Sequence, residues 1–200
     1  MRKINRIILH YLGVASSWSF VGQSAVDRIR RMHINENRWL DIGYHHIVDR
    51  NGSRFIGRPE NIQGAHASGH NYDTIAVLVM YGTIDTHLTK ETINSLTDLI
   101  SDISKRHSIS INSSTLLGHQ DLMPTQCPGI VQNEIPNIIK RLTLPVDNGK
   151  IKIEGLGGQI VEGILIDNQS YMRVRDFEKL IPDYKISWHG PTKTVRIERK

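Results

Sequence analysis

The sequence predicts an α/β protein whose mixed central sheet is flanked by helices, followed by a small α+β domain. Residues 74–82, TIAVLVMYG, form the continuous apolar run expected of a central strand. Residues 88–107 repeat apolar side chains at helical spacing, and residues 150–154, KIKIE, alternate strictly between apolar and charged. Since strands and helices interleave before residue 145, we expect helices packed against a sheet in that part.

Three further elements precede the central strand. Residues 4–12, INRIILHYL, predict a buried strand, and residues 22–34, GQSAVDRIRRMHI, predict a helix. Residues 44–58 predict a hairpin, because the Asn51-Gly52 pair suits a two-residue turn.

Two helices follow the central strand. The helix in residues 88–107 has Thr89 as its expected N-cap, and its inward stripe consists of Ile93, Leu96, Ile100 and Ile103. A second amphipathic helix is predicted over residues 133–142, with Asn133 as its N-cap.

A domain boundary is predicted near residue 145. Pro145 and the Asn148-Gly149 pair break the helical pattern before the alternation of KIKIE begins. We therefore expect domains over residues 1–144 and 150–200. Nine of the ten histidines precede residue 143, so the chemistry is expected in the first domain.

The charge balance limits the partners. The chain has 25 Lys and Arg against 20 Asp and Glu, a formal charge of +5, with no basic run. This charge favours a polyanionic surface, such as bacterial cell wall or nucleic acid. No nucleic-acid partner is expected, because the clustered basic and stacking residues that such binding needs are missing from the sequence.

The N-terminal residues do not have the pattern of a signal peptide. Their apolar stretch is interrupted by His10 and lacks a small-residue cleavage site. No run of about 18 apolar residues suggests a membrane helix. We therefore expect a protein made in the cytoplasm with no integral membrane segment.

Cys127 is the only cysteine, and it lies in the stretch MPTQCPG. It cannot form an internal disulfide, which favours a reducing compartment. It is either a small buried hydrophobe or a ligand. The flanking Pro124 and Pro128 prevent regular helix or strand, and binding residues are often placed on such irregular segments.

His10 near the end of the first strand and His119 in LLGHQD are of the right type to complete a metal site with Cys127. Zinc accepts imidazole nitrogen and thiolate sulfur, and catalytic sites keep three protein ligands. A zinc finger is disfavoured, since it needs four nearby ligands and usually paired cysteines. Residue types alone leave both a zinc site and ordinary packing residues open.

A series of motifs resembles the type 2 N-acetylmuramoyl-L-alanine amidases. These motifs are IILHYLG, DIGYHHIVDRNGSRFIGRP, GAHASGHN, IAVLVMYG and LLGHQDLMPTQCPG, in that order over residues 4–142. The family includes phage endolysins and is similar in fold to the peptidoglycan recognition proteins.

The resemblance implies roles for six residues. Tyr44 of GYH would be the catalytic tyrosine, and His66 and Asn71 of GAHASGHN would lie near the substrate groove. Three residues would bind Zn2+: His10, His119 and Cys127.

The sequence departs from the family pattern at two positions. The family's usual histidine pair on the first strand is here His10-Tyr11, but the ligand is the first of the pair. Many endolysins of the family have a lysine two residues before the ligand cysteine, where this chain has Thr125. Thr125 is therefore a candidate for a weaker, neutral catalytic hydrogen bond.

His45 and His46 follow the candidate tyrosine directly. Because side chains alternate across a strand, only one of the two is expected to share a face with the site.

The second domain is expected to have strands over residues 150–154, 170–175 and 194–199 and a short helix over 175–181. The stretches SYMRVRDFEKLIPDYKISW and KTVRI resemble the stalk-type domain first described at the N-terminus of copper amine oxidases. The resemblance implies wall binding or self-association into a homo-oligomer.

The expected function is zinc-dependent hydrolysis of the amide bond between the lactyl group of N-acetylmuramic acid and the L-alanine of the stem peptide. The expected partner is bacterial peptidoglycan. The expected setting is a phage or prophage endolysin, made in the host cytoplasm and then released to the wall. The alternative is a non-catalytic peptidoglycan recognition module.

Overall fold

A computed structural model describes residues 2–15 and 20–143, together with the backbone of five strands between residues 150 and 199. The chain divides into two compact units, Met1–Thr143 and Leu144–Lys200. The following paragraphs describe each unit by itself.

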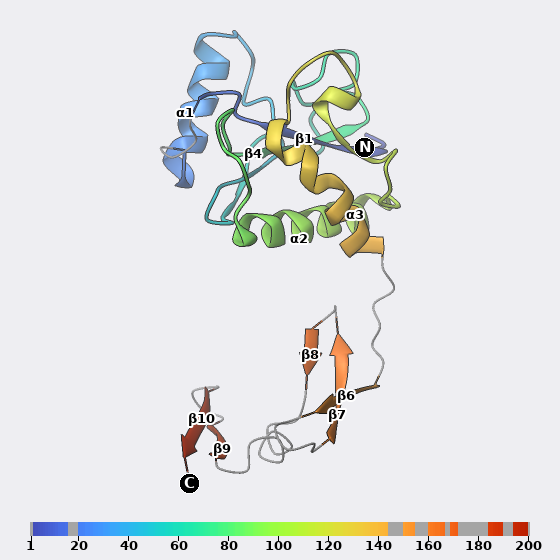
Figure 1. Cartoon of the computed structure of the whole chain (residues 1–200). Helices are drawn as coiled ribbons and strands as arrows, with labels where there is room; N and C mark the ends of the chain where they lie inside the picture. Colours follow the sequence, from blue (N-terminus) through green and yellow to red (C-terminus); the bar gives the residue numbers. More distant parts are fainter. Residues whose placement is uncertain are drawn as a thin grey trace. The chain divides into compact units, whose positions relative to one another are not determined.

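The first unit is built on a five-stranded sheet with the strand order β3-β2-β4-β1-β5 (Figure 1). Its strands are β1 (Arg6–Tyr11), β2 (His46–Val48), β3 (Arg54–Ile56), β4 (Thr74–Val79) and β5 (Leu116–Gly118). β4 runs parallel to β1 and β2, and β1 runs parallel to β5, whereas β2 and β3 form an antiparallel hairpin. The predicted mixed sheet is confirmed, with the fully buried β4 at its centre.

Helices cover both faces of this sheet. Two of them, α2 (Lys90–His107) and α3 (Ile135–Thr143), lie together on one side, and α1 (Gly22–Asn35) lies on the other (Figure 1). A large apolar cluster joins α2 and α3 to alternate residues of β1 and β4, including Leu9 and Val77. A smaller cluster packs α1 against the opposite face of β4, at Leu78.

The structure confirms the predicted N-cap and the predicted apolar stripe of α2. Thr89 has extended backbone angles, and its side chain accepts a hydrogen bond from the Thr92 N–H, as the N-cap prediction requires. In the predicted stripe, Leu96, Ile100 and Ile103 are buried and Ile93 is partly buried against the same cluster.

The predicted start of the last helix is wrong. Asn133 lies within a 3-10 helix, η2 (Gly129–Glu134), and α3 begins at Ile135. Pro136 explains the difference, because proline fits the first turn of an α-helix but its ring clashes with a carbonyl four residues earlier in a longer one.

In the second unit, β6 (Lys150–Glu154), β7 (Ile160–Ile166) and β8 (Gln169–Tyr171) form an antiparallel sheet. Two further strands, β9 (Tyr184–His189) and β10 (Thr194–Arg199), form an antiparallel pair. The predicted helix over residues 175–181 and most of the predicted strand over 170–175 lie outside the described residues.

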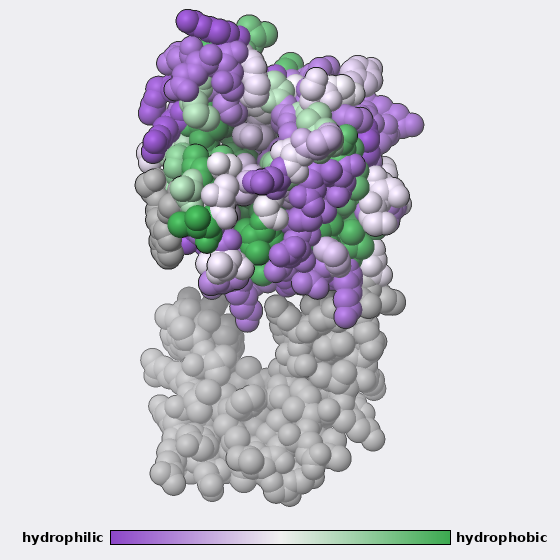
Figure 2. Space-filling model, turned by 45° about the horizontal axis from the view of Figure 1, so that its top comes forward, coloured by the Kyte–Doolittle hydropathy of each residue, from purple (hydrophilic) through white to green (hydrophobic). Residues whose placement is uncertain are grey.

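The visible face of the first unit carries mainly hydrophilic side chains with apolar ones between them (Figure 2). None of the helices in the described part of the chain is long and apolar enough to cross a membrane.

Candidate metal centre

Parallel strand pairing brings two histidines together. His10 lies on β1, and His119 follows β5 directly, in the short 3-10 helix η1 (His119–Asp121). The register pairs Leu9 with Gly118, so the next residue of each strand falls at the same edge of the sheet. The ring centroids of His10 and His119 are 4.6 Å apart.

A tight turn returns Cys127 to the same place. The Gln120 N–H donates to the carbonyl oxygen of Cys127 over 2.7 Å. Gly129 has a φ of +58°, and a Cβ at this position would lie 2.6 Å from the Tyr11 ring. Only glycine fits this backbone at such close approach, so the turn that carries Cys127 is packed directly onto β1.

The three side chains fit a zinc ion. Their ligand atoms all lie within 4.8 Å of one another, and His10 Nδ1 is 3.5 Å from Cys127 Sγ. A tetrahedral zinc with ordinary bond lengths holds nitrogen and sulfur about 3.6 Å apart. His119 Nε2 is buried without a hydrogen-bond partner among the described residues. Two imidazoles and one thiolate are a donor set that zinc accepts.

Burial controls the charge of these groups. It lowers the pKa of His10 well below the ordinary value, and the neighbouring His66 and His119 lower this pKa further. Burial also lowers the pKa of His119, so both imidazoles are neutral and have a free lone pair at neutral pH. Burial raises the pKa of Cys127 to about 11. A bound cation favours the thiolate and reverses that effect.

Tyr44 lies beside this cluster. The loop before β2 carries it, and the Arg58 N–H donates to its carbonyl oxygen over 2.8 Å. Its ring centroid is 5.2 Å from that of His10 and 5.6 Å from that of His33. Burial raises the pKa of Tyr44 above the ordinary value, so the phenol keeps its proton and can donate a hydrogen bond.

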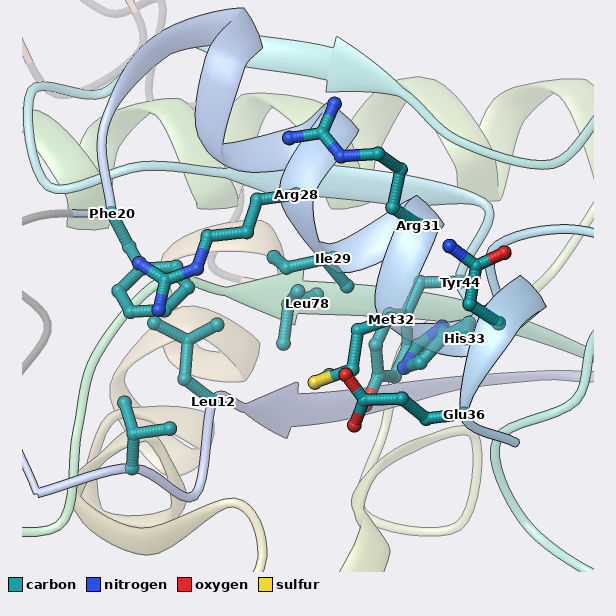
Figure 3. Close-up of a pocket in the computed structure, with 12 residues that line it drawn as sticks. Leu12, Phe20, Arg28, Ile29, Arg31, Met32, His33, Glu36, Tyr44 and Leu78 are labelled. Atoms are coloured by element: carbon teal, nitrogen blue, oxygen red, sulfur yellow. The ribbon is translucent and has the colours of Figure 1, made fainter.

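A cavity of about 370 Å³ opens next to Tyr44 (Figure 3). His33 and Tyr44 lie near one end of it, and the Arg28 guanidinium lies 4.7 Å over the Phe20 ring toward the other end. Apolar side chains from α1, from β4 and from Leu12, which directly follows β1, line the space between them. The cavity therefore combines an apolar wall with polar groups, as ligand pockets commonly do.

Thr125 is exposed, and its hydroxyl oxygen accepts a hydrogen bond from the Cys127 N–H over 3.2 Å. Thr125 therefore supports the turn that carries the cysteine. Its catalytic role stays a prediction.

His66 and Asn71 lie in the loop before β4. The side-chain oxygen of Asn71 accepts hydrogen bonds from the N–H groups of His66 and Ala67, both over 2.9 Å. His66 Nδ1 lies 3.0 Å from His10 Nε2. Each side chain thus has a partner within the protein, and a contact with substrate stays a prediction for both.

The two histidines after Tyr44 both make structural contacts. The fully buried His45 accepts a hydrogen bond from the Ala76 N–H at Nδ1, and its Nε2 lies 3.0 Å from the Ile62 carbonyl oxygen. His46 pairs with Glu60 over 2.6 Å. Neither belongs to the set of three candidate ligands.

The sequence interpretation did not single out His33, which lies on α1 and is buried. Its Nδ1 accepts a hydrogen bond from the Gly43 N–H, so the proton of the neutral ring is on Nε2. The spacing from Ile29 to His33 is one helical turn on the inward face, and this signal would have identified a buried histidine.

Comparison with known proteins identifies the class. Residues 1–130 match the family Amidase_2, described as N-acetylmuramoyl-L-alanine amidase. The chain belongs to this family.

Particular relatives come from phages, insects and bacteria. The chain is 34% identical to an endolysin of Enterobacteria phage T3 over 108 residues, which are 52% of this chain and 68% of the phage protein. It is 30% identical to peptidoglycan-recognition protein SC2 of Drosophila melanogaster over 130 residues, 64% of this chain and 70% of that protein. The solved structure of the N-acetylmuramoyl-L-alanine amidase LysC from Clostridium intestinale URNW matches with a TM-score of 0.58 and 25% identity, covering 68% of this chain and 85% of LysC.

The buried His45 predicts a loss of stability in acid. Burial lowers the pKa of His45 from 6.5 to about 4, so the unfolded chain binds this proton more readily than the folded one. The contribution of His45 to the free energy of unfolding should therefore be fully present above pH 6.5 and be lost as the pH is lowered toward 4. The difference between the two pKa values corresponds to about 3 kcal/mol.

Urea denaturation of the protein in chelator between pH 4 and 7.5 measures this effect. His45→Gln should reduce the fall in the free energy of unfolding between pH 6.5 and 4, because the variant lacks the imidazole whose pKa burial lowers. If the free energy of unfolding of His45→Gln varies with pH as in the wild type, His45 is not the cause of the loss of stability in acid.

Proposed function

We propose that this protein is a zinc-dependent amidase that hydrolyses the bond between the lactyl group of N-acetylmuramic acid and the L-alanine of the stem peptide. The observation that carries the proposal is the convergence of His10, His119 and Cys127 beside Tyr44, in a chain of the amidase family. Bacterial peptidoglycan is the substrate in this proposal.

Each residue has a defined task in this reaction. His10, His119 and Cys127 would hold zinc, which when bound polarises an amide carbonyl and lowers the pKa of a water molecule to about 7. Tyr44 donates its phenolic proton in a hydrogen bond to the charge that develops on the carbonyl oxygen, or orients the attacking water. Thr125 keeps the cysteine turn in place and supplies a neutral donor at the exposed rim.

The cavity next to Tyr44 supplies the place for substrate. Its apolar wall suits the methyl groups of lactyl and alanyl units, and Arg28 and Arg31 on its rim suit the carboxylates of a stem peptide. Since Tyr44 both lines the cavity and adjoins the candidate ligands, a substrate in the cavity would present its amide to the site.

The biological setting in this proposal is a phage or prophage endolysin, made in the host cytoplasm and released to the wall. Endolysin relatives support it. The second unit would add wall binding or self-association. A non-catalytic recognition module is the second candidate, because peptidoglycan-recognition proteins are also relatives. Mass spectrometry of digested peptidoglycan separates the two, since only the amidase releases peptides with a free L-alanine amine.

One equivalent of zinc should bind, and its removal by chelator should abolish wall lysis. Cys127→Ser should lose most of the metal, because a hydroxyl is a much poorer ligand for zinc than a thiolate. Metal analysis by mass spectrometry and lysis assays measure both effects. Full activity in a metal-free preparation would contradict the proposal.

Tyr44→Phe should retain zinc and fold but lower turnover on muramoyl-peptide by about a hundredfold, the scale of one lost hydrogen-bond donor or proton-transfer group. Thr125→Ala should cost less, since its hydroxyl is neutral and exposed. The control is zinc content, which both variants should keep. Wild-type turnover in Tyr44→Phe would remove the tyrosine from the mechanism.

A chain that ends at Thr143 should hydrolyse soluble muramoyl-peptides almost as well as the full chain but lyse intact walls more slowly. All assigned residues precede that point, and a tethered binding unit raises local concentration at an insoluble substrate without changing the catalytic step. Light scattering of both chains tests self-association. Loss of zinc from the shortened chain would mean that the two units depend on each other.

A further inference from the structure

The two ring nitrogens of His10 have different neighbours: Nδ1 lies beside the candidate ligand Cys127, and Nε2 lies beside His66. His10 Nδ1 lies 3.5 Å from Cys127 Sγ, whereas His10 Nε2 points away from the sulfur and lies 3.0 Å from Nδ1 of His66. A neutral imidazole carries one proton, so Nδ1 can bind a metal only when that proton is on Nε2. Something must therefore select this tautomer.

A chain of hydrogen bonds leads from His10 to a backbone carbonyl. His66 Nε2 lies 3.2 Å from the Thr74 hydroxyl oxygen. The Thr74 hydroxyl in turn donates to the carbonyl oxygen of His70 over 2.6 Å. His10 and Thr74 are almost completely buried, at 1% and 0% exposure, so both ends of this series are shielded from water, and His66 between them is partly buried.

The carbonyl oxygen of His70 fixes the donor and the acceptor of every hydrogen bond in this series. A carbonyl oxygen can only accept, so the single hydroxyl proton of Thr74 is committed to His70. The Thr74 oxygen must then accept from Nε2–H of His66, which leaves Nδ1 of His66 as an acceptor. His66 Nδ1 must accept from Nε2–H of His10, and the lone pair of His10 is left on Nδ1.

We propose that His66 and Thr74 are positioning residues that hold His10 in its metal-binding tautomer. The inference rests on the zinc site of the proposed function and gives His66 a role other than contact with substrate. The packing agrees with this role, since the His10 and His66 rings meet edge to face with centroids 5.0 Å apart. Outer partners of this kind typically change metal affinity by about 10- to 100-fold.

The first test measures the tautomers directly. In the full-length, metal-free protein labelled with 15N, long-range proton–nitrogen NMR correlations distinguish protonated from unprotonated ring nitrogens. We expect the proton of both His10 and His66 on Nε2. A proton on Nδ1 of either ring would overturn the proposal, and this result does not depend on any variant folding.

The second test measures zinc affinity by competition with a chelator of known affinity. Thr74→Val removes the hydroxyl and should weaken zinc binding by about tenfold or more, whereas Thr74→Ser keeps the hydroxyl and should restore wild-type affinity. Thr97→Val is the matched control, because Thr97 on α2 also donates to a backbone carbonyl, that of Ile93, over 2.7 Å. Wild-type zinc affinity in folded Thr74→Val would overturn the proposal.

These outcomes are separable from the proposed function. Suppose that the wild-type protein has both expected tautomers and that Thr74→Val binds zinc more weakly, but that the wild-type protein releases no peptide with a free L-alanine amine. This result would support the inference and contradict the amidase. A protein that cleaves muramoyl-peptides and binds zinc equally well in Thr74→Val supports the amidase and overturns the inference.

Discussion

The parallel pairing of β1 with β4 on one side and β5 on the other is the constraint on which the rest of the site depends. The pairing with β5 fixes Leu9 against Gly118 and so makes His10 and His119 neighbours across more than a hundred residues of sequence. The pairing with β4 sets Thr74 opposite Arg6, at the other end of β1, and the His66 side chain spans the distance from Thr74 to His10. A shift by one residue would move the His10 side chain to the opposite face of the sheet.

Residue type and motif order allowed the sequence to indicate the three candidate ligands that the fold brings together. His10, His119 and Cys127 are recognisable because few side chains bind zinc, and because their motifs follow one another in a specific order. Thr89 could be identified as a helix cap since capping is a local interaction between near neighbours. The start of α3 was missed, because Pro136 competes with the apolar periodicity that suggested a longer helix.

Other features depend on distances that no local pattern encodes. The contact between His10 and His66 joins residues 56 positions apart, and its direction depends on a carbonyl oxygen in a loop. The neutral state of buried imidazoles follows from desolvation, which is a property of the folded core. The side-chain oxygen of Asn71 also organises the loop backbone, a contact that the sequence did not predict. Such roles can be identified only from the folded structure.

The close contact between Tyr11 and Gly129 links two positions that would otherwise vary independently. Tyr11 alternates with His10 along β1, so its ring faces the cluster of α2 and α3 and not the candidate metal ligands. Any side chain at position 129 would collide with that ring. The dependence runs one way: a bulky ring at position 11 requires glycine at position 129, whereas the φ of +58° at position 129 favours glycine even where the residue at position 11 is small.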